Sequence, residues 1–315
     1  METGLIVFSG NANRPLAERI CDSLQTTLGS ASVSNFADGE TRVEIGSNVR
    51  GRDVFIIQPT CAPANHHIME ALIMADACRR SSAQRITLVV PYFGYARQER
   101  KNAPRTPITA KLVADLYETS GIDRILTLEL HTSAIQGFFN IPVDHLFAKP
   151  VFANYLHSRP DILLDLIIVS PDAGGVERAR ALAKYFNCGL AIVDKRRERP
   201  NESTVMNVIG DVKGRNCLIV DDICDTGGSL TKAADTLAAN GAKGVYAVVS
   251  HPVLSGPAIS RIEASALREF ICTDSIPLSA EAIKCSKIVQ LSISELFAEA
   301  IRRIHNSDSI SSLFV

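Results

Sequence analysis

Residues 221–229 combine carboxylates, hydroxyls and glycines in a pattern suited to binding a sugar phosphate. An apolar run at residues 217–220 predicts a buried strand, and apolar residues recur at helical spacing from Ser229 onward. Between strand and helix lie the residues that could do chemistry: Asp221, Asp222, Asp225, Thr226, Gly227, Gly228 and Ser229. Glycine lets backbone N–H groups converge, and the helix directs its positive end to the same point, so we expect one phosphate to bind here.

The carboxylates of this segment would repel a phosphate, so we expect them to serve sugar hydroxyls or a Mg²⁺ ion. The alternative is a tight strand-to-helix turn with solvated aspartates. Asp221 and Asp222 are adjacent at the end of a predicted buried strand, where charges require partners. A sugar-phosphate site is therefore the preferred interpretation.

A second strand, turn and helix start occurs at residues 168–175, again with an acid and paired glycines. We expect its backbone amides to bind phosphate oxygens, with Asp172 near a metal ion and with Gly174 and Gly175 in the turn. Taken alone, the segment could equally be a structural turn. Two anion-binding turns suit a substrate with a phosphate at one end and a diphosphate at the other.

Four cations lie within five residues after the predicted strand at 190–193: Lys195, Arg196, Arg197 and Arg199. A solvated loop and a nucleic-acid patch are alternatives, but the run is short and is interrupted by Glu198. We expect instead a loop that closes cations over transferring phosphates. Cations that stabilise such a transition state can contribute on the order of 10³–10⁵ in rate.

Three further segments could contact a nucleotide. Residues 91–101 mix aromatics, glycine and cations and suit a loop over a nucleotide, although a surface turn is also compatible. Phe36 could stack on a base with Asp38 and Glu40 as acceptors, although this segment alone is more simply structural. His131 follows a predicted strand, where α/β sheets place ligand-contacting residues. A lone histidine is more often structural, but neutral imidazole also binds metals.

Composition and charge describe an ordinary globular protein, with 46% hydrophobic and 21% charged residues. The net charge of −1 gives no reason to expect a nucleic-acid or membrane partner. Eight cysteines are scattered without zinc-binding spacing, and no apolar run approaches the ~18–20 residues of a membrane span. No secretion signal is evident near the N-terminus. We therefore expect a cytoplasmic protein.

Short apolar runs alternate with helical patterns, which predicts an α/β fold of largely parallel sheets with helices on both faces. The expected strands are residues 5–8, 54–57, 86–90, 125–130, 166–169, 190–193, 217–220, 245–249, 270–272 and 288–291. The expected helices are residues 15–28, 65–80, 107–119, 176–186, 229–240 and 292–304. Pro15 suits a first helical position, and Ser292 and Glu295 have capping-box spacing.

The length of 315 residues suits two domains of about 150 residues each. Pro142, Pro150 and Pro160 indicate a boundary near residues 145–160. Each half supplies its own series of strands, so we expect two similar α/β lobes, residues 1–149 and 150–299.

Taken together, these segments resemble the ribose-phosphate diphosphokinase family, also called phosphoribosyl-diphosphate synthetases, over essentially the whole chain. Residues 221–229 resemble the 5-phosphoribosyl-1-diphosphate loop of the type I phosphoribosyltransferase fold. The other matching stretches are residues 35–40, 91–98, 135–139 and 194–197. The resemblance implies two lobes of that fold, each a mainly parallel sheet flanked by helices. It also implies a homo-oligomer, a hexamer built from dimers.

The resemblance assigns ATP binding to residues 1–149 and ribose 5-phosphate binding to residues 150–299, with the tail at about 300–315 packing on the first lobe. For ATP it implies adenine contacts across a subunit interface by Phe36, Asp38 and Glu40, and further contacts by Arg97, Gln98 and His131. His131 and Asp172 would hold the Mg²⁺–phosphate assembly, with Gly174 and Gly175 in the diphosphate loop. For ribose 5-phosphate it implies contacts by Asp221, Asp222, Asp225 and residues 226–229. Lys195 and Arg197 would lie on the catalytic loop.

Some family positions differ in this chain. Glu99 and Glu129 stand where aspartate is usual, and Ala134 stands where glutamine is usual. Glu129 keeps a carboxylate but adds a methylene, which could shift metal geometry. Ala103 and Pro104 replace a basic residue and a serine in a segment linked to phosphate activation and ADP inhibition. The sequence therefore leaves the regulation open.

We expect the chain to transfer the β,γ-diphosphoryl group of MgATP to the C1 hydroxyl of ribose 5-phosphate, giving 5-phosphoribosyl 1-diphosphate and AMP for nucleotide synthesis. A salvage phosphoribosyltransferase would use the same sugar-phosphate loop, but it commonly needs one such domain and would leave Phe36 and Arg97 without a purpose. A non-catalytic regulatory subunit is compatible with Glu129 and Ala134, whereas Lys195 and Arg197 argue against it. A DNA-binding regulator would lack an evident basic domain.

Overall fold

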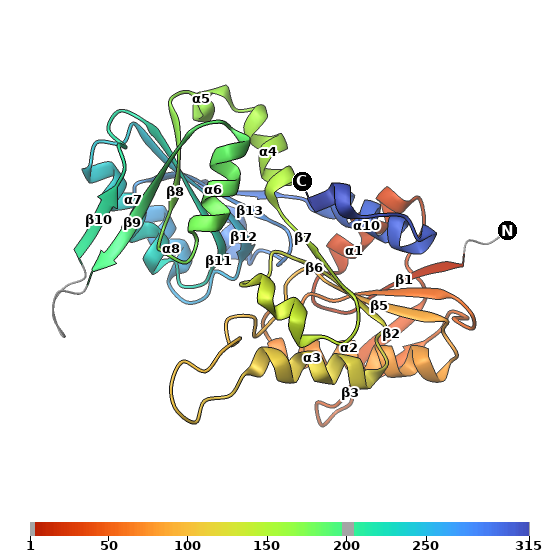
Figure 1. Ribbon diagram of the computed structural model, residues 1–315. Coiled ribbons are helices and arrows are strands. Elements are labelled where there is room, and N and C mark those ends of the chain that lie inside the picture. Colours follow the sequence, from red (N-terminus) through yellow and green to blue (C-terminus); the bar gives the residue numbers. More distant parts are fainter. Residues whose placement is uncertain (1–3, 197–204, 315) are drawn as a thin grey trace. The chain divides into compact units, whose positions relative to one another are not determined.

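The computed structural model describes residues 4–196 and 205–314 and divides the chain into two compact units (Figure 1). The first contains the chain up to Phe147, then Ser275–Pro277 and the residues from Ser292 onward. The second contains Ala148–Asp274 and Leu278–Leu291. The first segment thus ends close to the boundary expected between residues 149 and 150. More of the C-terminus belongs to the first unit than the tail expected at 300–315.

The first unit is built on a five-stranded parallel sheet in the order β1-β4-β5-β6-β7. Its strands are β1 (Leu5–Ser9), β4 (Asp53–Ile57), β5 (Arg85–Val90), β6 (Arg124–Leu128) and β7 (Val143–Leu146). Its helices are α1 (Arg14–Leu24), α2 (Ala64–Arg80), α3 (Thr109–Ser120), α10 (Ser294–Asn306) and the 3₁₀ turns η1 (Ser133–Phe138) and η2 (Ser311–Phe314). Helices α2 and α3 cover one face of the sheet, and α1 and α10 lie together on the other (Figure 1).

A separate antiparallel hairpin, β2 (Ala31–Asn35) and β3 (Thr41–Ile45), belongs to the first unit and was not expected from the sequence. Its strands have partly buried residues alternating with exposed ones, as one-sided packing requires. Polar residues dominate the exposed positions, so the apolar signal along the segment is weak.

Helix α10 returns the chain to the first unit by packing its apolar face against α1. Arg302 Nη2 donates to the Ser23 carbonyl at 3.1 Å, and His305 Nδ1 lies 2.8 Å from Asp53 Oδ2. The predicted capping box is wrong: Ser292 Oγ accepts the Ser294 N–H at 3.2 Å, and the helix begins at Ser294 without a side-chain cap. Glu295 is therefore one position too early in the helix to complete a capping box.

The second unit is built on a seven-stranded sheet in the order β10-β9-β8-β11-β12-β13-β14, parallel except for β10. Its strands are β8 (Leu166–Ser170), β9 (Gly189–Arg196), β10 (Val205–Ile209), β11 (Asn216–Cys224), β12 (Gly244–Pro252), β13 (Leu267–Thr273) and β14 (Ile288–Leu291). Its helices are α4 (Lys149–His157), α5 (Pro160–Leu163), α6 (Val176–Tyr185), α7 (Gly228–Ala239), α8 (Ala258–Ala264) and α9 (Ala280–Lys284).

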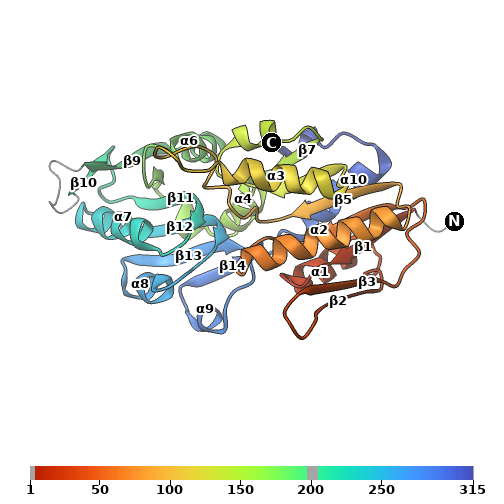
Figure 2. The same ribbon diagram turned by 90° about the horizontal axis from the view of Figure 1, so that it is seen from below.

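The strand order of the second unit reverses between β8 and β11. The chain moves from β8 outward to β9 through α6, and it later moves the opposite way from β11 to β12 through α7 and to β13 through α8. Right-handed crossovers in opposite directions place α6 on one face and α7 and α8 on the other, as Figure 2 shows. Such a reversal is where open α/β sheets bind ligands, beyond the carboxyl ends of the strands.

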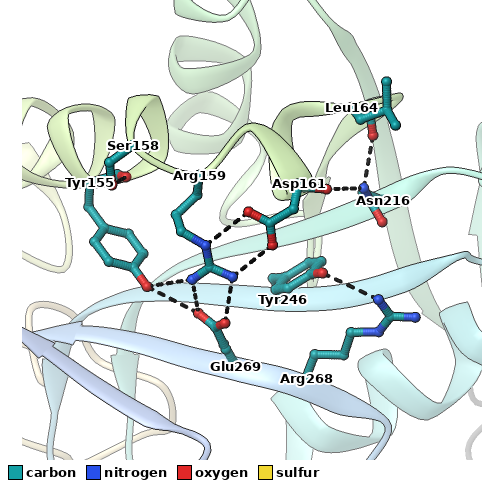
Figure 3. Close-up of polar contacts among 9 residues, drawn as sticks. All are labelled: Tyr155, Ser158, Arg159, Asp161, Leu164, Asn216, Tyr246, Arg268 and Glu269. Carbon is teal, nitrogen blue, oxygen red and sulfur yellow. Dashed lines mark hydrogen bonds and ion pairs between the residues drawn. The ribbon is translucent and has the colours of Figure 1, made fainter.

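An arginine ties the helical start of the second unit to its sheet (Figure 3). Arg159 Nε and Nη2 donate to Asp161 at 3.0 and 2.8 Å, and its Nη1 and Nη2 donate to Glu269 of β13 at 2.8 and 2.7 Å. The Tyr155 hydroxyl lies 2.7 Å from Arg159 Nη1 and 3.2 Å from Glu269. These fork-shaped pairs suit the planar guanidinium and fix α4 and α5 against the sheet.

Each predicted strand and helix is present, although several boundaries differ. Helix α1 ends at Leu24 rather than at residue 28, because Gln25 adopts a left-handed conformation with φ of 57°. The strand expected at residues 217–220 continues to Cys224. Within residues 4–196 and 205–314, no helix combines the length and apolar composition that crossing a membrane would need.

Candidate functional site

Three neighbouring strands of the second unit end at the same edge of the sheet and carry three of the predicted site segments. Strand β9 ends at Arg196, and so includes Lys195; β8 leads into the turn with Asp172; and β11 leads into residues 225–229. All three strands are parallel, so their carboxyl ends meet there. The structure therefore brings the two predicted phosphate turns together at the reversal of strand order.

The aspartates of β11 lie where this strand separates from β8. The last pairing with β8 joins Ile219 to Val169, whereas β11 remains paired with β12 through Asp221 and as far as Cys224. The sequence placed Asp221 and Asp222 after the strand, but they belong to its final stretch. The backbone of this stretch is thus paired with β12 on one side. On the other side its register with β8 has already ended.

The carboxylates of Asp221 and Asp222 share a cation that was not predicted. Arg178 Nη1, on α6, lies 3.3 Å from Asp222 Oδ1 and 3.9 Å from Asp221 Oδ1. Burial and the like charge of Asp222 nevertheless raise the pKa of Asp221 to about 8, with Arg178 acting in the opposite direction. A carboxylate pair with a pKa raised in this way favours an additional cation or a hydroxyl donor.

The glycine turn after β11 is packed and preformed. Gly227 has φ of 73°, and a Cβ added there would lie 3.4 Å from the backbone of Ala258. Arg261 Nη1 donates to the Thr226 carbonyl at 2.9 Å, and the Ser255 N–H donates to the Asp225 carbonyl at 2.9 Å. Helix α7 begins at once, with no acidic residue in its first turn and, in the part of the chain described, no side-chain cap. Its N-terminal amides are thus oriented for an anion.

The turn after β8 is closed by its own acid. Asp172 Oδ1 accepts the Gly175 N–H at 3.0 Å, and Ser170 Oγ donates to the Asp172 carbonyl at 2.6 Å. Asp172 itself is exposed, as is Gly174, whereas Gly175 is buried at the start of α6. The turn therefore has a defined shape and presents a carboxylate to solvent.

The predicted catalytic cations are only partly within the described residues. The backbone of Lys195 pairs with Met206 in the antiparallel ladder of β9 and β10, next to the carboxyl edge. Arg197 lies outside the described residues. The short cation run therefore begins on a strand rather than in a loop.

The predicted ATP-binding residues of the first unit follow two adjacent strands. Residues 91–101 follow β5, and His131 follows β6, so both start at the carboxyl edge of the five-stranded sheet. Arg97 and His131 are exposed. Gln98 ties this segment to α3, because its Oε1 accepts from Thr109 Oγ1 at 2.6 Å and its carbonyl accepts from the Ala110 N–H at 3.3 Å.

Phe36, Asp38 and Glu40 form the tip of the β2–β3 hairpin. The Phe36 N–H donates to the Glu40 carbonyl at 2.8 Å, and Asp38 Oδ1 accepts the Glu40 N–H at 3.1 Å. The Phe36 ring is 49% exposed, with the Arg42 guanidinium 5.8 Å from its centroid. An exposed ring beside a cation suits stacking on a base, provided that another surface covers it.

The two predicted metal ligands belong to different units, His131 to the first and Asp172 to the second. Within either described stretch of the chain, no group of three or more histidine, cysteine or acidic side chains is arranged to hold a metal. The oxygen donors of Asp172, Asp221 and Asp222 are nevertheless of the type that Mg²⁺ prefers. Mg²⁺ also keeps several waters and binds through substrate phosphates, so a large protein cage is not required.

Arg178 and Arg261 are the supporting residues that the sequence did not reveal. Arg178 lies within the first turn of α6. Arg180 follows two residues later on the same helix and is exposed. Choosing between two arginines needs the orientation of the helix, which the sequence does not show. Arg261 acts from α8, more than thirty residues after the turn that it supports.

Comparisons with known proteins agree with this architecture. Residues 5–121 match the family model for the N-terminal domain of ribose phosphate pyrophosphokinase, and residues 195–315 match the model for a phosphoribosyl synthetase-associated domain. The crystal structure of phosphoribosylpyrophosphate synthetase from Mycobacterium smegmatis superimposes with a TM-score of 0.91 at 39% identity, covering 96% of this chain and 99% of that one.

Curated relatives match over nearly their whole length. The ribose-phosphate pyrophosphokinase of Burkholderia pseudomallei is 55% identical over 312 residues, covering 99% of this chain and 98% of the relative. That of Rhizobium meliloti is 56% identical over 308 residues, covering 98% and 99%. This chain belongs to the ribose-phosphate pyrophosphokinase family, a family of transferases, and has the two phosphoribosyltransferase-like lobes predicted from the sequence.

Proposed function

We propose that this chain transfers the β,γ-diphosphoryl group of MgATP to the C1 hydroxyl of ribose 5-phosphate, giving 5-phosphoribosyl 1-diphosphate and AMP. The observation that carries the proposal is the meeting of the β9, β8 and β11 ends at one edge of the second sheet. The backbone of the strand that carries Lys195, an acid-bearing turn and a glycine turn meet there, an arrangement that suits a reaction between two phosphate-bearing substrates. The naming of full-length relatives as ribose-phosphate pyrophosphokinases supports the same reaction.

In this proposal, residues 226–229 bind the 5-phosphate through the amides that open α7. Asp221, Asp222 and Asp225 face the ribose hydroxyls, for which carboxylates are suitable acceptors. Arg178 keeps the acid pair partly neutralised, since its guanidinium lies within 4 Å of both carboxylates. The sugar is thus gripped at its phosphate and aligned through its hydroxyls.

The diphosphoryl donor, MgATP, is the second substrate in this proposal. Gly174, Gly175 and Asp172 form the diphosphate loop, and Arg97, Gln98 and His131 contact ATP. The exposed hairpin tip with Phe36, Asp38 and Glu40 contacts adenine across a subunit interface. We therefore also propose a homo-oligomer, a hexamer built from dimers, in the cytoplasm. Light scattering on the purified protein tests the assembly, and a monomer at micromolar concentration would contradict it.

His131 and Asp172 would hold the Mg²⁺ that accompanies the phosphates, with the Asp221–Asp222 pair close to the acceptor sugar. When bound, Mg²⁺ supplies positive charge that neutralises the phosphate oxygens. The raised pKa of Asp221 and the exposed Asp172 carboxylate fit a site that accepts a cation. Glu129 lies two residues before His131 in the sequence and stands where the family usually has aspartate.

The chemical step is positioning together with electrostatics. The C1 hydroxyl attacks the β-phosphorus of ATP, the bond from that phosphorus to the α,β-bridging oxygen breaks, and AMP leaves with that oxygen. Lys195 and Arg197 neutralise the charge that develops on the transferred group and on AMP. Because no covalent intermediate with the protein is formed, none of these side chains needs to act as a nucleophile.

One assay tests the proposal. Purified protein is incubated with MgATP and ribose 5-phosphate, and the products are identified by chromatography and by ³¹P NMR. We expect AMP and sugar diphosphate in equal amounts and dependence on the sugar. Formation of ADP, or absence of ribose-dependent AMP, would refute the reaction. Consumption of 5-phosphoribosyl 1-diphosphate only when a nucleobase is added would instead indicate a salvage phosphoribosyltransferase.

A further inference from the structure

The chain turns into His131 through a strained and buried corner. Strand β6 ends at Leu128, and Glu129 then adopts φ of +41°, in the left-handed region that non-glycine residues rarely occupy. Glu129 and Leu130 are buried, whereas His131 is exposed. A backbone conformation of this kind persists only where the surrounding structure holds it, and it is frequent beside functional residues.

Strand β7 holds this corner by two hydrogen bonds. The Glu129 N–H donates to the Leu146 carbonyl at 2.8 Å, which extends the β6–β7 ladder by one residue. The Leu130 N–H donates to the Nε2 atom of His145 at 2.8 Å. This second bond is not part of the ladder, because a side chain replaces the carbonyl that a strand would supply.

The geometry determines which nitrogen of His145 carries the proton. A backbone N–H can only donate, so Nε2 must be the unprotonated nitrogen, and the proton of the neutral ring lies on Nδ1. His145 is buried, and its ring is tilted against that of Phe147 with centroids 4.6 Å apart. Gln136 Nε2 lies 3.4 Å from Nδ1, but an amide nitrogen also donates, so this contact is not a hydrogen bond to a protonated Nδ1. The ring is therefore held by its packing against Phe147 and by the bond from the Leu130 N–H, with its acceptor aimed at the corner.

We propose that His145 is a positioning residue for the ATP and Mg²⁺ site: by accepting the Leu130 N–H, it holds the corner that presents His131. The ATP-binding role of His131 rests on the function proposed above, whereas the hydrogen bond and the strained corner are observed directly. His145 does not itself touch the substrate. Residues that orient a ligand in this way typically affect affinity or activity by about 10–100-fold when they are replaced.

Two substitutions separate the acceptor from the bulk of the side chain. Gln places an amide oxygen near the position of Nε2, so H145Q keeps an acceptor, whereas H145M keeps a similar volume without one. His67 is the matched control, because it is also a buried histidine of the first unit and its Nδ1 lies 2.8 Å from the Cys61 carbonyl. H67M therefore reports the general cost of removing a buried imidazole.

Hydrogen exchange of the Leu130 amide in the ligand-free protein is the first measurement. We expect exchange at least about tenfold faster in H145M, and near wild-type exchange in H145Q and H67M, since only H145M loses this bond. The second measurement is kinetic: KM for MgATP is expected to rise about tenfold in H145M, with KM for ribose 5-phosphate nearly unchanged, and H145Q is expected to restore it.

Unchanged Leu130 protection in H145M would overturn the proposal, as would an equal rise in KM for both substrates or the same selective rise in H67M. In the unaltered protein, the ¹⁵N shifts of the His145 ring offer a check that needs no variant: a proton on Nε2 would also overturn it. A wild-type protein without ribose-dependent AMP formation would refute the proposed function itself. The exchange and ¹⁵N measurements would then still decide whether His145 holds the corner.

Discussion

The two turns assigned to the two substrates differ in how the fold supports them. Both contain a glycine with positive φ, 73° at Gly227 and 94° at Gly39. A Cβ at Gly227 would meet Ala258, whereas a Cβ at Gly39 would meet nothing within 4 Å. The first turn is supported by Arg261 from another helix, while the second is a hairpin tip held by its own short-range bonds. One turn is packed and the other is open.

This difference suggests a division of labour in the proposed reaction. A phosphate turn at a buried strand end has its amides oriented before the ligand arrives, so binding costs little reorganisation. An exposed hairpin with a half-exposed ring gains a defined environment only when another surface covers it. We therefore expect substitutions in the packed turn to act within one subunit and substitutions in the hairpin to act between subunits.

The largest effect is expected at Lys195, which belongs to neither turn. Replacing it by alanine should lower kcat at least about a hundredfold, since cations that stabilise charge in a transition state are worth on the order of 10²–10³ each. Neither KM should change much, which would separate the chemical step from both binding regions. Lys184, exposed at the end of α6, is the matched control for loss of a positive charge in the second unit. Near-normal turnover in K195A would remove Lys195 from the mechanism.

The next effect tests the packed turn. G227A should raise KM for ribose 5-phosphate about tenfold, because a left-handed conformation costs about 1–2 kcal/mol in a residue with a side chain, and relieving that strain here would displace the amides proposed to bind the 5-phosphate. Gly214 provides the matched control, with φ of 71° in the same unit and open space around its Cβ position. G214A should lower the free energy of unfolding by a similar amount, because its backbone is also left-handed, but it should leave KM for ribose 5-phosphate unchanged. An equal KM for both variants would show that the geometry of the turn at Gly227 does not matter for ribose 5-phosphate binding.

The sequence predicts a feature of this fold well when the residues that encode it follow one another closely in the chain. The phosphate turns were predictable because strand, acid, glycine and helix follow one another within about ten residues. The β2–β3 hairpin was missed because Val33 and Val43 are among its few apolar residues, too sparse to show a period. The continuation of β11 through Asp221 was missed because charged residues seldom lie in a strand that is buried on both sides.

Supporting residues were beyond sequence reasoning for a different reason. Arg178, Arg261 and His145 act on segments that are distant in the sequence, and each is one of several similar residues. Only the packing of helix or strand selects which of them points at the site. The roles given to Lys195 and Arg197 came from the family resemblance, and they remain predictions.

A moderate effect is expected at the open turn. F36A should raise KM for ATP about tenfold, because stacking of a base on an aromatic ring is worth about 1–3 kcal/mol, and leave KM for ribose 5-phosphate unchanged. Stability should change little, since the ring is half exposed. Tyr185, 48% exposed in the second unit, is the matched control.

Mixed assemblies of F36A with K195A offer a sharper version of the same test. If the hairpin serves a neighbouring subunit, dissociating and reassembling the two variants together should create some sites with both residues intact. Activity above the sum of the separate variants is therefore expected. Strict additivity would place Phe36 in the same site as its own Lys195, and the contrast between the two turns would then lose its functional meaning.

The last prediction concerns the pH dependence of stability in the packed region. Burial and Asp222 raise the pKa of Asp221 to about 8 in the folded chain, compared with an ordinary value of 3.8. Both states are protonated below pH 4, and the unfolded state gains from ionisation as the pH rises. The stability associated with the proton is therefore present below about pH 4 and is lost progressively until about pH 8.

D221N removes this titration, so wild type should lose stability relative to D221N between about pH 4 and pH 8, with no further loss above that. Each kcal/mol corresponds to about 2–4 °C in Tm for a domain of this size, which calorimetry at several pH values resolves. D38N at the open turn is the matched control for removing an aspartate. Ribose 5-phosphate with Mg²⁺ should reduce the difference, because a bound cation stabilises the ionised Asp221. A Tm difference independent of pH would mean that Asp221 is ionised throughout, and that the packed turn is already neutralised by Arg178 alone.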